Sequence, residues 1–265
     1  MLNKTGFLTL IAGATLAMAA PSAVHANPTA PTKPATPTKP ATAVKPAATV
    51  SVLKDVSVSV TPGTLAKSTT IKIVPAVSNN HDEPPFMNGE PEHFRVQFDN
   101  DKLSNDTSFL ERQLLVYPLA QYGKLFKGKE KAEFDKIVWK LQTVISKKSD
   151  AGMKSLPILP AAEAFEVFHT HVKHLLFKQG KGISYITCYA QDDAPINNGD
   201  FFYTYQGITD DLKYYVSLFV PVQAKGLPKD SPSKKAKEFL NNLPSSGFTP
   251  DLDQIDKMAQ SISIK

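Results

Sequence analysis

The stretch FFYTYQGITDDLKYYVSLFVPV, residues 201–222, contains two segments typical of strands with a turn between them. Residues 201–206 are mostly aromatic, and residues 213–222 alternate apolar with other side chains. By the period of two of a strand, one face of the second segment carries Tyr214, Val216, Leu218, Val220 and Val222. The intervening Thr209-Asp210-Asp211 suits a turn, because Asp side chains bond their own backbone there. The stretch therefore predicts an antiparallel hairpin.

More strand patterns precede this hairpin along the chain. The alternating segment ISYITCYA at 183–190 adds a third strand and completes a β-meander, with Gly180 and Gly182 at the turn before it. Four earlier segments also have strand character, at residues 50–60, 69–77, 94–98 and 113–117. An antiparallel sheet is therefore expected to dominate the domain.

Three segments have the features of helices. In Lys129–Lys147, apolar residues recur at helical spacing while Lys and Glu fill the other side. Ser233–Leu243 is the second, and the third is expected to begin with Thr249 as N-cap and Pro250 as its first helical residue. These patterns predict an α+β fold, with an antiparallel β-sheet and its C-terminal β-meander packed by about three helices.

The first 49 residues differ in composition from the rest. Residues 1–26 have the pattern of a secretory signal peptide, with a positive start, an apolar run and small residues before an expected cleavage after Ala26. Residues 27–49 repeat TKPAT and are rich in Pro, Ala, Thr and Lys, so a disordered, extended linker is expected. We expect an exported protein, periplasmic or secreted, with a single domain over residues 50–265. No later stretch reaches the roughly 18 apolar residues of a membrane span, so no transmembrane segment is expected after cleavage.

The positive charge of the chain lies mostly in that N-terminal part. The full chain has 30 basic and 25 acidic residues. Four lysines precede residue 50, which leaves 26 basic against 25 acidic residues in the domain. Only Arg95 and Arg112 are arginines, the side chain whose planar fork best matches phosphate. A nucleic-acid partner is therefore not expected.

Several spaced blocks resemble a family of uncharacterised exported bacterial proteins and lipoproteins. The blocks are LPILP (156–160), FFYTYQGITDD (201–211), KYYVSLFVPV (213–222) and FTPDLDQIDKMAQSI (248–262). The resemblance covers roughly residues 90–265. It implies an α+β domain outside the cytoplasm and no known activity, so it assigns no catalytic residue. His169 fits the pattern of the family, whereas His171, His174 and Cys188 are particular to this chain.

The segment FHTHVKH, residues 168–174, holds three of the six histidines. In a regular strand, His169 and His171 point to one face and His174 to the other. Two such imidazoles can hold zinc or copper if a third ligand comes from another strand. The alternative is that they are polar strand residues, one of them satisfied by a hydrogen bond in the core. His169 and His171 are therefore candidates for a metal site, although no metal or other cofactor is predicted.

The hairpin itself offers candidate binding groups. Tyr203 and Tyr205 share one strand face, and with Tyr215 across the turn they could form a tyrosine-rich platform for a sugar, a peptide or a partner protein. The alternative is that a helix, with residues 129–147 as the first candidate, covers that face. Asp210 and Asp211 are the adjacent candidates for ligand binding, although turn chemistry also accounts for them.

No linear catalytic motif is present. The chain has no GxSxG elbow, SxxK, phosphate loop or dinucleotide fingerprint, and Cys188 lies in an apolar segment that predicts a buried thiol. The favoured hypothesis is an exported non-catalytic binding or envelope-associated module, with an unknown envelope component or protein as partner. One alternative is a hydrolase acting on envelope polymers, whose mark would be a cleft with two convergent titratable groups. The other is a periplasmic metal-binding protein that uses His169 and His171.

Overall fold

The computed structural model describes residues 51, 53–82, 87–104, 107–162 and 164–265. The signal peptide (1–26) and the linker (27–49) expected from the sequence lie outside this range. In the described part of the chain, no helix combines the length and the apolar character that a membrane crossing requires.

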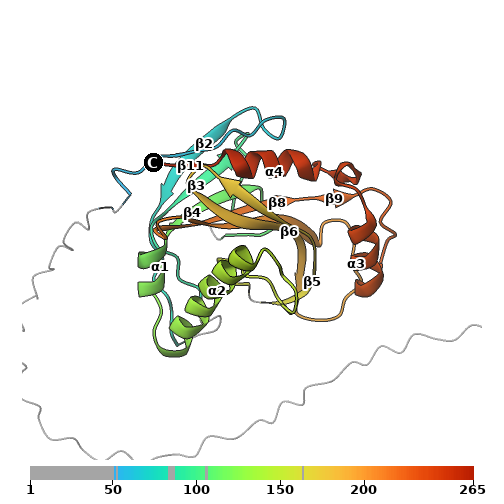
Figure 1. Ribbon diagram of the computed structural model, residues 1–265, viewed down its shortest axis with the longest axis horizontal. Coiled ribbons are helices and arrows are strands. Elements are labelled where there is room, and N and C mark those ends of the chain that lie inside the picture. The colour runs from blue at the N-terminus through green and yellow to red at the C-terminus, as the bar shows by residue number, and fades with distance from the viewer. Residues whose placement is uncertain (1–50, 52, 83–86, 105–106, 163) are drawn as a thin grey trace, which may run out of the picture. The chain divides into compact units, whose positions relative to one another are not determined.

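A seven-stranded antiparallel sheet, built from described residues, forms the centre of the domain (Figure 1). Its strands lie in the order β2-β3-β4-β8-β7-β6-β5. They are β2 Thr69–Val74, β3 His93–Phe98, β4 Gln113–Pro118, β5 Phe165–Phe177, β6 Gly180–Ala190, β7 Phe201–Thr209 and β8 Tyr214–Pro221. Strands β2, β3 and β4 thus form one half of the sheet. The chain then crosses to β5 at the far edge, and β6, β7 and β8 follow in order back to β4. The α+β class and the meander of β6, β7 and β8 are confirmed.

The hairpin of residues 201–222 joins the two halves of the sheet. Tyr205 in β7 lies opposite Leu218 in β8, and Leu218 in turn lies opposite Leu114 in β4. The five alternating residues predicted to share a face all pack into or against one apolar cluster. The sequence pattern therefore predicts which residues of β8 share a face, while Tyr215, Ser217 and Phe219 are buried on the other face.

One face of the sheet is covered by α4 (Leu252–Ser261) and by apolar residues of the segment 53–66. Figure 1 shows α4 lying along this face. The expected start of this helix is wrong: Asp251 is the N-cap, and its carboxylate accepts a 2.8 Å hydrogen bond from the Asp253 amide. Thr249 belongs instead to the short strand β10 (Phe248–Thr249), which pairs with β9 (Gln223–Ala224).

The opposite face is covered by α1 (Leu119–Lys124) and α2 (Gly128–Lys147). The predicted helix of residues 129–147 is confirmed as α2, which buries Phe134, Leu141, Val144 and Ile145. Burying an apolar side chain of this kind stabilises the folded state by about 1.5–3 kcal/mol relative to leaving it exposed. The remaining helix, α3 (Ser233–Asn242), lies beside the edge strand β5 (Figure 1).

The strand expected over residues 50–60 is wrong in extent. Among the residues of this segment that the structure describes (51 and 53–60), only Val58–Ser59 forms a strand, β1, paired with β11 (Ser263–Ile264) at the C-terminus. Alternation alone does not make a strand, because the backbone also needs a neighbour to bond. Among the described residues of this segment, Val58 and Ser59 have such a neighbouring strand, β11.

Strand β5 contains an irregularity that changes which way its residues point. Its pairing with β6 shifts between Thr170 and Lys173, and His171 in between has a left-handed φ of 55°. Such a bulge inserts extra residues on one strand and breaks the period of two. Residues after it therefore lie on the opposite face from the one that simple alternation predicts.

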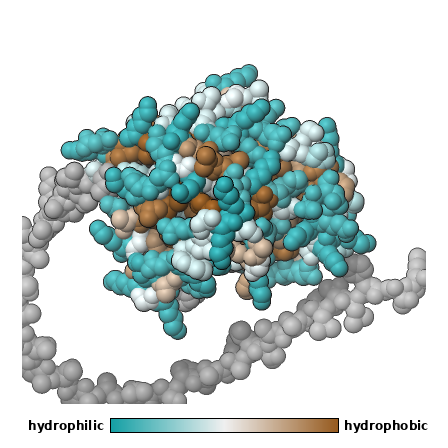
Figure 2. Space-filling model, viewed as in Figure 1, coloured by the Kyte–Doolittle hydropathy of each residue, from teal (hydrophilic) through white to brown (hydrophobic). Residues whose placement is uncertain are grey.

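Exposed large apolar side chains occur at both edges of the sheet. Ile71 and Ile73 are exposed on β2, and Phe165 and Leu176 are exposed on β5. Figure 2 shows hydrophilic side chains over most of the view, with apolar residues in a band between them. Central strands are covered from both faces, so the large apolar side chains exposed on the seven-stranded sheet lie on its edge strands, while Val77, Leu110, Trp139 and Leu212 are exposed outside the sheet.

Candidate functional site

A cavity of about 630 Å³ lies on the α2 side of the sheet. Its lining includes Val77 and residues 87, 88 and 90 between β2 and β3, residues 107–110, residues 160–162 with Ala164, and the rings of Tyr189 and Phe202. The volume is within the range of sites that bind small molecules, roughly 300–1,000 Å³. Most of the lining is apolar, and Glu90, His93, Arg95 and Asp200 contribute the ionisable groups.

Backbone hydrogen bonds hold Glu90 in the wall of this cavity. Val77 and Glu90 form an isolated antiparallel bridge, with N–H to O distances of 2.8 and 3.0 Å. The Gly89 amide next to it donates to the Asn79 side-chain oxygen at 3.0 Å. These contacts tie both ends of the long connection together, so the position of Glu90 does not depend on its side chain.

Glu90 meets His93, which also lines the cavity, and Tyr117. The Tyr117 hydroxyl donates to Glu90 Oε2 at 2.7 Å, and His93 Nε2 lies 3.6 Å from the same oxygen. His93 Nδ1 lies 2.8 Å from the Pro91 carbonyl oxygen, which can only accept, so Nδ1 carries the proton. The His93 and Tyr117 rings pack with centroids 4.7 Å apart. The histidine ring is therefore fixed on both sides.

Burial determines the protonation of these groups. Burial lowers the pKa of His93 more than the Glu90 carboxylate raises it, so the imidazole is neutral and Nε2 carries a lone pair. Burial and the same carboxylate raise the pKa of Tyr117 well above its ordinary value, so its hydroxyl stays a donor. His93 is 2% exposed, and its Nε2 has no hydrogen-bond partner among the described residues.

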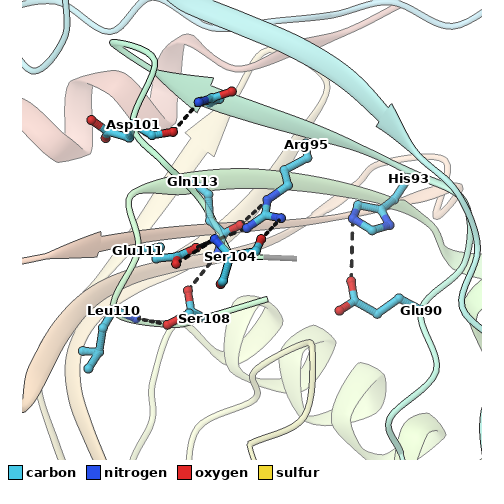
Figure 3. A network of polar contacts seen from close by, with 10 residues as sticks. Glu90, His93, Arg95, Asp101, Ser104, Ser108, Leu110, Glu111 and Gln113 are labelled. Carbon is cyan, nitrogen blue, oxygen red and sulfur yellow. Dashed lines mark hydrogen bonds and ion pairs between the residues drawn. The ribbon is translucent and has the colours of Figure 1, made fainter. Parts of the chain in front are cut away.

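Arg95 belongs to a separate network on the same strand. Its guanidinium donates to Gln113 Oε1 at 2.7 Å, to the Ser104 carbonyl at 2.9 Å and to Glu111 Oε2 at 3.3 Å. Gln113 in turn donates to the Ser108 carbonyl at 2.7 Å. Figure 3 shows Arg95 directed toward these groups, while His93 is directed toward Glu90. The Arg95 charge is thus compensated by Glu111, and the network anchors the loop that forms one cavity wall.

Aromatic rings form another side of the cavity. Phe109 stacks on Phe202 with ring centroids 5.4 Å apart, and Tyr189 lies 6.0 Å from Phe109 and 6.2 Å from Phe202. Phe109 comes from a loop, whereas Tyr189 and Phe202 come from β6 and β7. The loop is therefore packed against the sheet rather than left free.

The LPILP segment, residues 156–160, precedes and anchors the wall formed by Pro160, Ala161 and Ala162. The Leu159 amide donates to Gln206 Oε1 at 3.1 Å, and its carbonyl accepts from the Ser217 hydroxyl at 2.6 Å. Tyr185 donates to the Pro157 carbonyl at 2.8 Å. Polar side chains from three neighbouring strands thus bond an irregular segment to the sheet, which satisfies its buried backbone.

The tyrosines predicted to form a platform are buried. Tyr203 and Tyr205 lie under α4 and the C-terminal residues, whereas Tyr215 lies on the opposite face against the α2 side. The platform prediction is wrong because adjacent layers cover both faces of the central strands. The alternative, that a helix covers Tyr203 and Tyr205, is confirmed, but the helix is α4 instead of residues 129–147.

Tyr205 has a packing role that the sequence pattern did not indicate. Its ring lies over Gly182 and Gly207, where an added Cβ would come within 2.7 and 2.8 Å of ring atoms. The two glycines therefore leave the space that the ring fills.

Asp210 and Asp211 lie at the turn between β7 and β8. Asp211 accepts from the Thr209 hydroxyl at 2.7 Å and from the Lys213 amide at 3.1 Å, and these bonds lower its pKa. Asp210 pairs with Lys181 at 3.4 Å. Both line a second cavity, of about 520 Å³, which does not include Tyr203, Tyr205 or Tyr215. The structure thus keeps the two aspartates together but separates them from the tyrosines.

The bulge in β5 separates His169 from His171. His169 faces Asp150 and Glu166, at 3.6 and 3.4 Å, whereas His171 Nε2 contacts the Leu240 carbonyl of α3 at 2.7 Å. The expectation that these two imidazoles share a face is wrong, and so is the expectation for His174, which contacts the Val144 carbonyl of α2. Among the described residues, no group of three or more His, Cys, Asp or Glu side chains is arranged to hold a metal ion.

Cys188 is buried, as predicted. Its side chain is 1% exposed within the cluster between the sheet and α4. Burial, with a contribution from the Asp200 charge, raises its pKa to about 11. The thiol is therefore protonated at neutral pH.

No protein-family model, curated protein or solved structure matches the chain. The assignment of a function therefore rests on the geometry of this fold.

The residues that line the first cavity are not among the site residues predicted from the sequence. A usable signal is the strand HFRVQF at 93–98, where polar His93, Arg95 and Gln97 alternate with apolar Phe94, Val96 and Phe98. Three polar residues on one face of an internal strand are unusual and mark a polar site. Glu90 has no comparable signal, because a loop places it there.

Proposed function

We propose that this protein is an exported, non-catalytic module that binds a small ligand in the 630 Å³ cavity. The observation that carries the proposal is the combination of a mostly apolar lining with two ionisable side chains, Glu90 and His93, that approach to 3.6 Å. Small-molecule sites commonly have this composition, in which apolar walls supply affinity and a few polar groups supply orientation.

The fixed walls support binding as the role of the cavity. The bridge between Val77 and Glu90, the Arg95 network and the bonds of Leu159 each attach one wall to the sheet. A site held by such contacts is formed before the ligand arrives, so little of the binding energy is lost in ordering it.

A fragment screen by ligand-observed NMR tests this proposal. The wild-type protein is compared with Ala162→Phe, because Ala162 lines the cavity and the larger ring would fill part of it. We expect several fragments to bind the wild type and to lose binding in the variant. A screen in which no fragment distinguishes the two proteins would contradict the proposal.

Export is the second component of the proposal and is tested separately. Fractionation of the producing cells, with N-terminal sequencing of the mature protein, should place it outside the cytoplasm and begin it at Asn27. An intact N-terminus in the cytoplasmic fraction would contradict export without affecting the cavity.

A hydrolase acting on envelope polymers is the second candidate function. A specific observation favours it, since Glu90 and His93 are two convergent titratable groups in one cavity. Purified peptidoglycan incubated with the protein tests this candidate, with the release of soluble fragments as the readout. Release that both Glu90→Gln and His93→Gln abolish would replace the binding proposal, whereas no release from the wild type would leave binding as the function.

A further inference from the structure

We propose that the ligand of this cavity is an organic cation, an amine carried on an apolar or aromatic body. This inference rests on the binding function proposed above and assigns its ligand class. It follows from three features of the cavity, namely an uncompensated carboxylate, a buried unpartnered nitrogen and a wall of aromatic faces.

The first feature is the charge balance of the lining. Glu90 is 17% exposed at its side chain, and among the described residues it forms no ion pair with Lys or Arg. Arg95, the cation of the lining, is paired with Glu111, and no lysine of the described residues lines the cavity. Asp200 adds a second carboxylate to the wall. A largely buried carboxylate without a counter-charge is costly, and a ligand cation would remove that cost.

The second feature is the orientation of His93. Its Nδ1–H donates to the Pro91 carbonyl, so Nε2 faces Glu90 as an acceptor without a partner. A neutral imidazole cannot neutralise the carboxylate beside it. The Glu90 side chain is the more exposed of the two, 17% against 3%, and the His93 nitrogen behind it offers no proton. The carboxylate therefore keeps acceptor capacity that an ammonium with its three N–H donors would complement. An anionic ligand would meet only repulsion and lone pairs there.

The third feature is the aromatic wall. Phe109, Tyr189 and Phe202 line the same cavity as Glu90. Aromatic faces attract cations through their quadrupole and also pack against apolar groups. Aromatic rings next to carboxylates are the pattern that recognises organic cations, so the wall suits both parts of such a ligand.

Binding of three matched probes to the purified full-length protein tests the inference. The probes are 4-phenylbutylamine, 4-phenylbutan-1-ol and 4-phenylbutyrate, which share the body and differ in the charge of the head. Dissociation constants are measured by titration with ¹⁵N chemical shifts, which also locate the site. We expect the amine to bind about tenfold or more tightly than the alcohol, and the carboxylate to bind weakest.

Two variants assign the preference to Glu90. In Glu90→Gln the amine should lose about tenfold in affinity while the alcohol changes less than about twofold. Glu92→Gln is the matched control, because this neighbouring glutamate does not line the cavity. It should leave both affinities unchanged. If Glu90→Gln fails to fold, the comparison of the three probes on the wild type still decides the charge preference.

The outcomes separate this inference from the proposed function. If the alcohol or the carboxylate binds as well as the amine, and Ala162→Phe abolishes that binding, the cavity is a ligand site but the cation assignment is wrong. If the amine is preferred but neither Glu90→Gln nor Ala162→Phe weakens it, the amine binds elsewhere and the inference is overturned. If no probe binds, both the inference and the proposed function are contradicted.

Discussion

The Tyr203 hydroxyl donates a 2.8 Å hydrogen bond to the Asp256 carboxylate, inside the interface between β7 and α4. The same carboxylate accepts from the Ser184 hydroxyl at 3.2 Å and from Lys173 Nζ at 2.7 Å. A tyrosine that the sequence suggested for ligand binding therefore holds a helix on the sheet. Because Asp256 is 7% exposed and all three partners are donors, the interface depends on a full carboxylate.

Asp256→Asn should destabilise the fold by about 1–3 kcal/mol, because an amide replaces one acceptor oxygen and leaves a buried donor unpartnered. Urea unfolding of the two proteins measures the difference. Asp253→Asn is the control, since Asp253 also contacts Lys173 but its side chain is 63% exposed. That change should cost less than about 0.5 kcal/mol. An equal decrease in the free energy of unfolding in both variants would show that the buried Asp256 carboxylate contributes no more to stability than the exposed Asp253.

The left-handed backbone of His171 predicts a second stability difference. Asn adopts such a conformation readily, whereas a β-branched residue does not, at a cost of about 1–2 kcal/mol. His171→Val should therefore be less stable than His171→Asn by about that amount. Both variants lose the bond to the Leu240 carbonyl and the contact with Phe248, so the comparison isolates the backbone. Equal stability of the two variants would mean that the bulge is absent in solution.

Buried His93 predicts a stability that falls in mild acid. Burial, with a smaller contribution from the Arg95 charge, lowers its pKa in the folded state against the opposing effect of Glu90, and Tyr117 packs on its ring. Below about pH 6.5 the unfolded chain therefore binds a proton that the folded chain excludes. The free energy of unfolding should therefore decrease as the pH falls through that window and be unaffected by His93 above it. The maximum slope for one group is about 1.4 kcal/mol per pH unit.

Urea unfolding between about pH 5 and pH 8 measures this slope for the wild type and for His93→Gln. The other five histidines are present in both proteins, so the difference between the two slopes belongs to His93. The variant should show the shallower decrease. Superimposable curves would contradict a buried neutral imidazole.

The single cysteine allows a simple test of the core. Because burial raises the pKa of Cys188 to about 11, its reaction with a disulfide reagent at pH 8 should be on the order of a hundredfold slower than for a free thiol. After unfolding in urea, the single thiol should react rapidly and release one equivalent of the reagent's thiolate per chain. Fast reaction of the native protein would show that the reagent reaches Cys188, and so that this part of β6 is not closely packed in the cluster with α4.

Local patterns predicted most of the secondary structure. Alternation over residues 183–190 and 213–222 predicted β6 and β8, and helical spacing predicted α2, because side chains return to the same face with a different period in strands and in helices. The C-terminal helix shows the limit of this approach. Thr249-Pro250 has the composition of a helix start, but pairing with β9 takes Thr249 into a strand and the helix begins at Leu252.

By itself the sequence determined the fold class, the residues of β8 that share a face and the burial of Cys188, since these depend on neighbours within a strand or a helix. Only the tertiary structure decided which surfaces stay open. It covered Tyr203 and Tyr205 with α4, turned His171 away from His169 at a bulge, and brought Glu90 from a loop to His93 on β3. These relationships join residues from different elements, and no local period encodes how separate layers pack, which is the physical reason that they emerge only in the folded chain.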